Sequence, residues 1–226
     1  MTLSAARRTP LFEQVVGQLR EQITSGRWPV GSRIPIEPEL AERFGVARGT
    51  VREAVRALAH NGLLDIRQGS GTYVAATSEL AGVMRRRFAE IGHADIRELR
   101  MTLEASAAAL AAVRRTEADL ELLQGALDQR DLAWEEGDTE RFVQADAAFH
   151  HAVVAAAHNA ALTGLYADLG EVLRDELRDY LTAGLDPERK VDHGGLVAAI
   201  RDGDAAAATA EATHFFPKLA EGGESQ

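Results

Sequence analysis

An arginine-striped segment between residues 47 and 58 is the strongest constraint on how this chain folds. At 3.6 residues per turn, its apolar residues fall on one helix face: Val51, Val55 and Leu58. Its arginines recur every four residues on another face: Arg48, Arg52 and Arg56. Three guanidinium groups on one face repel each other unless an anion lies across them, and the planar guanidinium matches a phosphate or a guanine edge.

A solvated amphipathic helix is the default alternative for this pattern, but the flanking sequence favours DNA binding. Upstream, residues 37–44 predict a short helix that Gly45 ends with a positive φ. A tight connection at residues 46–47 leads into the arginine helix, which is typical of a helix-turn-helix. Downstream, residues 63–67 and 72–74 predict two strands of a hairpin around a glycine-containing turn. We therefore predict a winged helix-turn-helix.

These motifs carry a resemblance to a known family. The matching stretches are Arg33-Ile34-Pro35, Glu39-Leu40-Ala41, Val46-Ala47-Arg48, Thr50-Val51-Arg52-Glu53-Ala54, Gly62-Leu63 and Gln68-Gly69-Ser70-Gly71-Thr72. In order and spacing, residues from about 10 to 75 resemble the DNA-binding domain of GntR superfamily transcription regulators. The sequence departs from the family at Pro38, Ala47 and Gly49, each of which removes a donor for phosphate or base.

The resemblance implies which residues meet the operator. Arg48, Thr50 and Arg52 are expected in the major groove and on its phosphates, and Gly69 of the wing in the minor groove. The full set that we assign to DNA binding is Arg33, Arg48, Gly49, Thr50, Arg52, Gln68 and Gly69.

The formal net charge of −10 is unevenly distributed along the chain. Residues 1–75 contain ten arginines and seven acidic residues, a net charge of +3, whereas the remainder has fifteen basic and twenty-eight acidic residues, a net charge of −13. This fits one domain that meets nucleic acid and one that avoids it. The absence of cysteine excludes disulfides, thiolate metal sites and thiol nucleophiles. Without a signal-like segment or an apolar run of about 18 residues, we expect a cytoplasmic protein.

The remainder of the chain predicts helices without strands. Alanine- and leucine-rich segments are broken by capping and turn residues at Thr116, Gly137, Asn159 and Gly203. About six antiparallel helices result, which is a bundle. The predicted protein is thus mostly α-helical, with a winged helix-turn-helix at residues 1–75, a linker at 76–79 and an all-α effector-binding and dimerisation domain at 80–226.

Candidate metal ligands stand out in the predicted bundle. Asp146 and His150 are four residues apart, so on a helix they share a face and can bind one ion. His193 and His214 lie on the last two predicted helices. Imidazole and carboxylate ligands suit zinc, nickel or manganese. For each histidine alone, a hydrogen-bonded core residue is the competing interpretation, but a charged Asp146 on an apolar helix needs a partner.

A second resemblance covers this half. Its matching stretches are Arg100-Met101-Thr102-Leu103-Glu104, Asp146-Ala147-Ala148-Phe149-His150, Asn159, His193, Ala199-Ile200, Gly203-Asp204 and His214. Residues from about 80 to 218 resemble the FCD ligand-binding domain of FadR-type GntR regulators, in the six-helix, VanR-like branch. The resemblance implies that Asp146, His150, His193 and His214 hold a divalent metal, and that Arg100 pairs a carboxylate effector. Gapless alignment puts Phe215 at the last ligand position, whereas a deletion near Gly203 restores His214.

Together these features favour a ligand-responsive transcription regulator, most often a repressor in this family, and not an enzyme. A homodimer carrying two winged helices would bind a pseudo-palindromic operator in double-stranded DNA. A small carboxylate bound in the bundle would shift the operator affinity. Two alternatives remain: a regulator whose metal is structural or absent, and a metal-dependent hydrolase, which leaves the winged helix unexplained.

Overall fold

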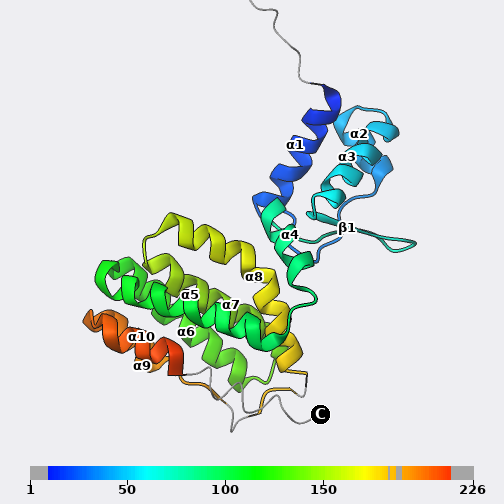
Figure 1. Ribbon diagram of the computed structural model, residues 1–226. Helices are drawn as coiled ribbons and strands as arrows, with labels where there is room; N and C mark the ends of the chain where they lie inside the picture. Colours follow the sequence, from blue (N-terminus) through cyan, green and yellow to red (C-terminus); the bar gives the residue numbers. More distant parts are fainter. Residues whose placement is uncertain (1–9, 183, 187–189, 215–226) are drawn as a thin grey trace, which may run out of the picture. The chain divides into compact units, whose positions relative to one another are not determined.

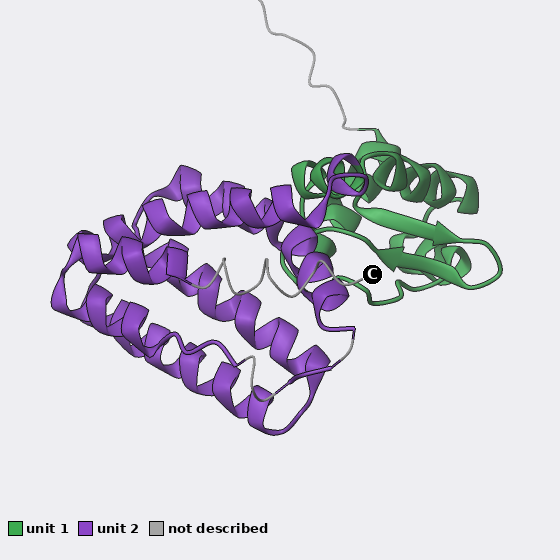
Figure 2. Cartoon of the chain, turned by 60° about the horizontal axis from the view of Figure 1, so that its bottom comes forward, with its two compact units in different colours: residues 1–86 green, residues 87–226 purple. Residues whose placement is uncertain are grey.

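The computed structural model describes residues 10–182, 184–186 and 190–214. The chain divides into two compact units, residues 1–86 and 87–226, which are coloured separately in Figure 2. Most of the described chain is helical, and one small antiparallel hairpin follows the first three helices (Figure 1). The predicted fold class is confirmed.

The first unit is a three-helix module followed by a wing. Its elements are α1 (Leu11–Thr24), α2 (Glu37–Phe44), α3 (Arg48–His60), β1 (Leu64–Arg67) and β2 (Gly71–Val74). Gly45 adopts a φ of 65° and ends α2, as predicted from the sequence. The strands pair with Leu64 opposite Val74 and Arg67 opposite Gly71. A bridge between Arg33 and Tyr73 adds the segment before α2 to the edge of the hairpin.

One apolar core holds these elements together. The α3 stripe predicted from the sequence is buried, and it packs against α1 and α2. The fully buried members of this core include Leu19, Ile23, Leu40, Val51 and Leu58. Because the apolar face of α3 is buried in this way, its arginine face is exposed.

Helix α4 (Glu79–Phe88) packs on the turn between α3 and β1 through two glycines. Gly62 has a φ of 82°, and its carbonyl oxygen lies 2.5 Å from where a Cβ on Gly82 would be. Arg20 on α1 also pairs with Glu79 at 2.6 Å. The predicted linker at 76–79 therefore ends where a helix begins, and most of α4 belongs to the first unit.

We expect Gly82→Ala to destabilise the first unit by about 1–3 kcal/mol, because its Cβ would overlap the backbone of Gly62. The matched control is Gly17→Ala on α1, where an added Cβ meets nothing within 4 Å. That change should stabilise the unit by up to ~1 kcal/mol. Urea unfolding followed by Trp28 fluorescence in a Trp134→Phe background measures both effects. A neutral Gly82→Ala would show that α4 does not dock on this turn in solution.

The described residues of the second unit beyond α4 form a six-helix bundle (Figure 1). Its helices are α5 (His93–Arg114), α6 (Glu117–Glu135), α7 (Thr139–Ala156), α8 (Ala160–Tyr180), α9 (Gly194–Asp202) and α10 (Ala205–His214). The predicted breaks coincide with their ends. Thr116 and Asp119 form a capping box at α6, and Asn159 caps α8 through its side chain. Gly203 ends α9 with a φ of 78°.

Helix α7 lies centrally in the bundle, with contacts to α5, α6 and α8. The largest core cluster consists of alanines and aliphatic residues of α5, α6, α7, α9 and α10 around Phe149. The alanine-rich face of α5 lets α9 and α10 approach closely. None of the helices in the described part of the chain is long and apolar enough to cross a membrane.

Candidate DNA interface and buried ionic site

Exposed arginines of α3 form the candidate recognition face of the first unit. Arg48, Arg52 and Arg56 are all solvent-exposed. The Nε of Arg52 lies 3.0 Å from Oε2 of Glu37 on α2, in a partly exposed ion pair. A surface pair of this kind contributes about 0–1 kcal/mol, so an anion of DNA can compete for the guanidinium.

The start of α3 has backbone donors that no side chain caps. Ala47 is the N-cap residue and makes no side-chain cap hydrogen bond. Gly49 is exposed and Thr50 is half-buried in the first turn that follows. Open N–H groups at a helix N-terminus suit a phosphate. Ala47 and Gly49 lack the side-chain donors that relatives often have at these positions. The backbone N–H groups are therefore the donors that the start of α3 can offer to a phosphate.

The wing places the remaining predicted DNA contacts at its tip and base. Gln68 and Gly69 are exposed in the hairpin turn, where Gly69 has a φ of 76°. Arg33 lies against Gly71, so close that a Cβ on that glycine would fall 2.4 Å from the arginine Nε. Gly71 is therefore required for the arginine to lie along the wing. All seven residues assigned to DNA binding lie in the first unit.

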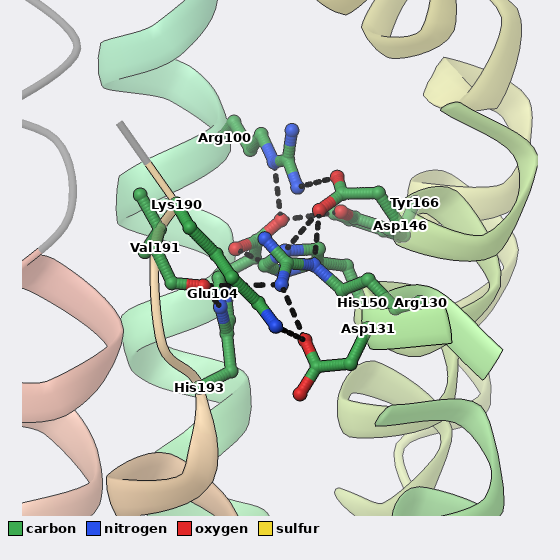
Figure 3. A network of polar contacts seen from close by, with 10 residues as sticks. All are labelled: Arg100, Glu104, Arg130, Asp131, Asp146, His150, Tyr166, Lys190, Val191 and His193. Carbon is green, nitrogen blue, oxygen red and sulfur yellow. Dashed lines mark hydrogen bonds and ion pairs between the residues drawn. The ribbon is translucent and has the colours of Figure 1, made fainter. Parts of the chain in front are cut away.

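A buried ionic network around Asp146 forms the second candidate site, inside the bundle (Figure 3). Both carboxylate oxygens of Asp146 are engaged by arginines. Nη2 of Arg100 on α5 lies 3.1 Å from Oδ2, and Nε of Arg130 on α6 lies 2.8 Å from Oδ1. The side chains of the two arginines are 10% and 3% exposed, so these are buried charges that depend on their partner.

Glu104 is the second carboxylate of this network. Its Oε1 accepts from Nε of Arg100 at 2.7 Å and from the Tyr166 hydroxyl at 2.5 Å. Its Oε2 lies 2.8 Å from Nδ1 of His150, an ion pair when the imidazole is protonated. Glu104 thus orients Arg100 and lies behind His150, as carboxylates behind metal-binding histidines do.

Arg130 connects Asp146 to the segment that carries His193. Its Nη1 donates to the carbonyl oxygen of Val191 at 3.1 Å, while its guanidinium lies 5.0 Å from the ring centroid of Phe142. Nδ1 of His193 lies 3.3 Å from the same carbonyl oxygen. Arg130 therefore contacts both Asp146 on α7 and the segment before α9.

The donor set of this site suits a divalent metal. Asp146, His150 and His193 each offer a ligand atom, all within 4.8 Å of one another. Ligand atoms of a tetrahedral zinc ion are about 3.4 Å apart, so side-chain shifts of about 1–1.5 Å would bring them into range. With Nδ1 of His150 facing Glu104, its Nε2 lies 3.6 Å from Oδ1 of Asp146. Two buried imidazoles beside a carboxylate fit a metal better than an apolar core. His214 is exposed at the end of α10 and is not part of this group; its role as a ligand stays a prediction, and Phe215 lies outside the described residues.

The charges of the network are fixed by mutual contacts. Burial alone would raise the pKa of Asp146, but His150, Arg100 and Arg130 outweigh it and hold that pKa well below its usual value. Burial likewise opposes ionisation of Glu104, yet Arg100 and His150 bring its pKa to about 2. Burial and the charge of Arg130 lower the pKa of His193 well below its usual value, which keeps this imidazole neutral. Burial and the charge of Arg100 would lower the pKa of His150, but Glu104 and Asp146 outweigh them and raise it. Ionised carboxylates and neutral imidazoles are the forms that bind a metal, so metal binding would release the proton of His150.

A cavity of about 430 Å³ lies between α7 and α8 and reaches the network. Arg100, Asp146 and Tyr166 line its inner part, while apolar residues of both helices such as Val143 and Leu173 form its walls. This is the size range of small-molecule sites. Arg100, which sequence analysis predicted to pair an effector carboxylate, lines this cavity; its role stays a prediction.

Sequence analysis missed three members of the network. Glu104 had a signal, since it lies four residues after Arg100 and so shares its helix face. Arg130 stands on a polar helix with acidic neighbours, and Tyr166 on another helix, without a local pattern that separates them from surface residues. Only the packing of α5, α6, α7 and α8 reveals their contacts.

Both halves of the chain match known protein families. The model for bacterial regulatory proteins of the gntR family matches residues 11–74, and that for the FCD domain matches residues 95–216. The HTH-type transcriptional regulator LutR of Bacillus subtilis is 34% identical over 163 residues, which cover 70% of this chain and 73% of LutR. The galactonate operon transcriptional repressor of Escherichia coli is 30% identical over 206 residues, covering 86% of this chain and 89% of the repressor.

A solved structure extends the likeness across both units. Streptococcus agalactiae GntR shares 30% sequence identity and a TM-score of 0.52, covering 93% of this chain and 99% of that chain. The first family match contains the exposed arginines of α3, and the second contains the whole ionic network around Asp146.

Proposed function

Because the chain belongs to the GntR family of bacterial regulatory proteins and carries an FCD domain behind its winged helix-turn-helix, we propose that it is a repressor controlled by a small carboxylate. The chain is a DNA-binding transcription regulator of the GntR/FCD type. The family and its relatives are transcription regulators, so the hydrolase alternative is set aside. The repressor assignment follows the name of the galactonate operon repressor.

One observation carries the effector proposal. Arg100 is buried and charged, yet it lines a cavity that is otherwise mostly apolar. Glu104 and Asp146 offset the desolvation cost of this buried charge, so the position of the guanidinium in the cavity lining is what supports a ligand. An effector carboxylate would be bound by the N–H groups of Arg100 that Glu104 and Asp146 do not take. Arg100 is thus our effector anchor, oriented by Glu104.

The metal in this proposal is a divalent ion held by Asp146, His150 and His193. Zinc is our first choice, with nickel or manganese as alternatives, because the donors are one carboxylate and two imidazoles. A fourth position is filled either by His214, after movement of the end of α10, or by the effector carboxylate. The metal would supply positive charge beside the effector.

The response to the effector follows from coupling between two sites. We propose a homodimer, formed through the bundle, whose two α3 helices contact the half-sites of a pseudo-palindromic operator. An effector that binds better to one arrangement of the dimer shifts the population toward it and changes the operator affinity. The expected coupling is about 1–3 kcal/mol, or about 5–150-fold in affinity.

The test starts from operator DNA selected by the purified full-length protein out of a random pool. Metal content is measured by elemental mass spectrometry on untagged protein, and about one divalent ion per protomer is expected. Operator affinity, measured by fluorescence anisotropy, should fall by about tenfold with an effective small carboxylate from a panel. It should respond far less in Arg100→Met, which keeps the apolar stem. If the protein holds no metal but its operator affinity still responds to a carboxylate, the metal site is wrong and the regulatory function stands. If no carboxylate changes the operator affinity, the proposed control by a carboxylate effector is wrong.

A further inference from the structure

Arg130 binds the oxygen of Asp146 that faces the imidazole of His150. Its Nε lies 2.8 Å from Oδ1 of Asp146, and Nε2 of His150 lies 3.6 Å from the same oxygen. The other oxygen, Oδ2, pairs with Nη2 of Arg100 at 3.1 Å. A guanidinium therefore already holds the carboxylate oxygen that would join the imidazole in binding a metal (Figure 3).

The buried charges of this network balance without a metal. Arg100 and Arg130 contribute two positive charges, and Glu104 and Asp146 contribute two negative charges. A divalent ion added to this set would leave an excess of two positive charges inside the bundle. Buried charges are weakly screened, so this excess opposes binding of the ion. Tight binding therefore requires one of the two guanidinium groups to move away.

Arg130 has a second carboxylate to which it can move. Its Nη1 lies 3.5 Å from Oδ1 of Asp131, whose side chain is 35% exposed. A guanidinium that leaves Asp146 can therefore pair with Asp131, where water also reaches the carboxylate. Arg100 differs in this respect, because its partners Glu104 and Asp146 are both buried. Of the two arginines, Arg130 is the one that can leave Asp146 without losing every carboxylate partner that water reaches.

We propose that Arg130 is the resident counter-cation of Asp146, and that a divalent ion binds by displacing it toward Asp131. This inference rests on the proposed function, in which Asp146, His150 and His193 hold the metal. The opposite role for Arg130 is that of a donor that orients a metal-bound carboxylate, as partners of metal ligands often do. Removing the charge of a competing cation raises the metal affinity, whereas removing an orienting donor lowers it.

The test is zinc binding to the full-length protein after its metal has been removed with a chelator, measured by competition with a fluorescent zinc indicator. Arg130→Met, which keeps an apolar stem without the charge, should bind zinc at least about tenfold more tightly than the parent. Arg130→Gln should shift the affinity in the same direction and decides the question if Arg130→Met does not fold. Arg130→Lys retains the charge and should stay within about threefold of the parent. Equal or weaker binding in the neutral variants would overturn the proposal.

Arg97→Met is the matched control for loss of an arginine inside the bundle. Nη1 of Arg97 lies 2.7 Å from Oε1 of the buried Glu176, and the Arg97 side chain is 16% exposed. Neither residue of this pair belongs to the network around Asp146. The control should therefore change the zinc affinity by less than about twofold.

A fluorescence readout reports whether Arg130 moves. The Arg130 guanidinium lies 5.0 Å from the ring centroid of Phe142, and the ring of Trp134 packs edge-on against the same ring. In a Trp28→Phe background, saturating zinc should change the emission of Trp134 in the parent, because the cation leaves the ring that Trp134 contacts. The change should be absent in Arg130→Met. The same emission response in both proteins, or none in the parent, would show that zinc does not displace the arginine.

Asp131→Asn tests the destination of the displaced side chain. In the parent it should weaken zinc binding by up to about fivefold, the range of one partly exposed ion pair. In the Arg130→Met background it should have no effect, because no guanidinium is left to be received. An equal loss in both backgrounds would mean that Asp131 attracts the metal directly and does not receive Arg130.

The outcomes separate this inference from the function on which it rests. If the parent and Arg130→Met bind zinc equally well, the metal site stands and the competition is refuted. If zinc binds to the neutral variants but not to the parent, the competition stands and the parent works without a metal. If zinc binds to none of these proteins, the metal site is wrong and the competition is refuted with it.

Discussion

Asp146→Ala is expected to abolish metal binding and to destabilise the bundle by about 3–5 kcal/mol, the range observed when one partner of a buried ion pair is removed. The reason is that two buried arginines share this carboxylate. Arg130 would keep a carbonyl oxygen and a longer contact of 3.5 Å to the partly exposed Asp131. Arg100 would keep Glu104. One positive charge thus becomes uncompensated inside the bundle.

The measurement uses Trp134, which packs edge-on against Phe142 at a centroid distance of 4.9 Å. In a Trp28→Phe background, its fluorescence reports urea unfolding of the bundle. Metal content is measured in parallel on the same preparation. Asp128→Ala removes an exposed carboxylate that contacts Gln124 on α6 and serves as the control, with a change within about 0.5 kcal/mol. A bundle as stable as the parent would mean that water or an anion replaces Asp146 between the arginines.

A second substitution separates charge from shape. Asp146→Asn keeps the volume and one acceptor oxygen but removes the negative charge, so it should lose metal and still destabilise the bundle. If Asp146→Asn retains metal at one equivalent per protomer, Asp146 is not a ligand. The network around Glu104 and His150 would then be a structural core of polar residues.

Local signals in the sequence were sufficient for most of the fold. Each predicted helix end had its own physical reason, such as the left-handed Gly45 after α2 or the capping box of Thr116 and Asp119 at α6. The hairpin of the wing followed from two strand-forming stretches around a glycine-containing turn. These features act within a few residues, so the amino-acid pattern alone contains them.

The packing of α4 was not predictable in this way. Nothing near Gly82 in the sequence indicates that its missing Cβ meets the carbonyl of Gly62, twenty residues earlier. The segment was therefore assigned to a linker and to the start of the bundle. A close backbone approach needs two glycines that become adjacent only when the helix docks.

The candidate site was predictable only where its residues share one helix. Asp146 and His150 share a helix face by spacing alone, and the structure brings His193 to them. A charged Asp146 on an apolar helix indicated that it needs a partner, but the sequence did not indicate which residues are its partners. Arg130 reaches it from α6 and Arg100 from α5, through contacts that depend on helix crossing and register. His214 is exposed at the end of α10, and its role as a ligand stays a prediction.

Operator binding should be weakened by about 1–3 kcal/mol, or about 5–150-fold, in Arg48→Ala. Arg48 is exposed in the first turn of α3, where recognition helices contact base edges. If it also neutralises a phosphate, the slope of log affinity against log salt should become shallower by about 0.9. Fluorescence anisotropy at several salt concentrations measures both quantities. Arg27→Ala removes an exposed arginine paired with Glu21 at the end of α1, outside the recognition helix, and is the control.

Arg52→Ala should have a smaller effect than Arg48→Ala, for a reason visible in the free protein. Arg52 must leave its ion pair with Glu37 before it can bind DNA, which costs up to about 1 kcal/mol. It follows that Glu37→Gln should strengthen operator binding by up to about fivefold, and that this gain should vanish in the Arg52→Ala background. Unchanged affinity in both arginine variants would refute α3 as the recognition helix. A gain from Glu37→Gln that persists without Arg52 would instead reflect general repulsion between Glu37 and phosphate.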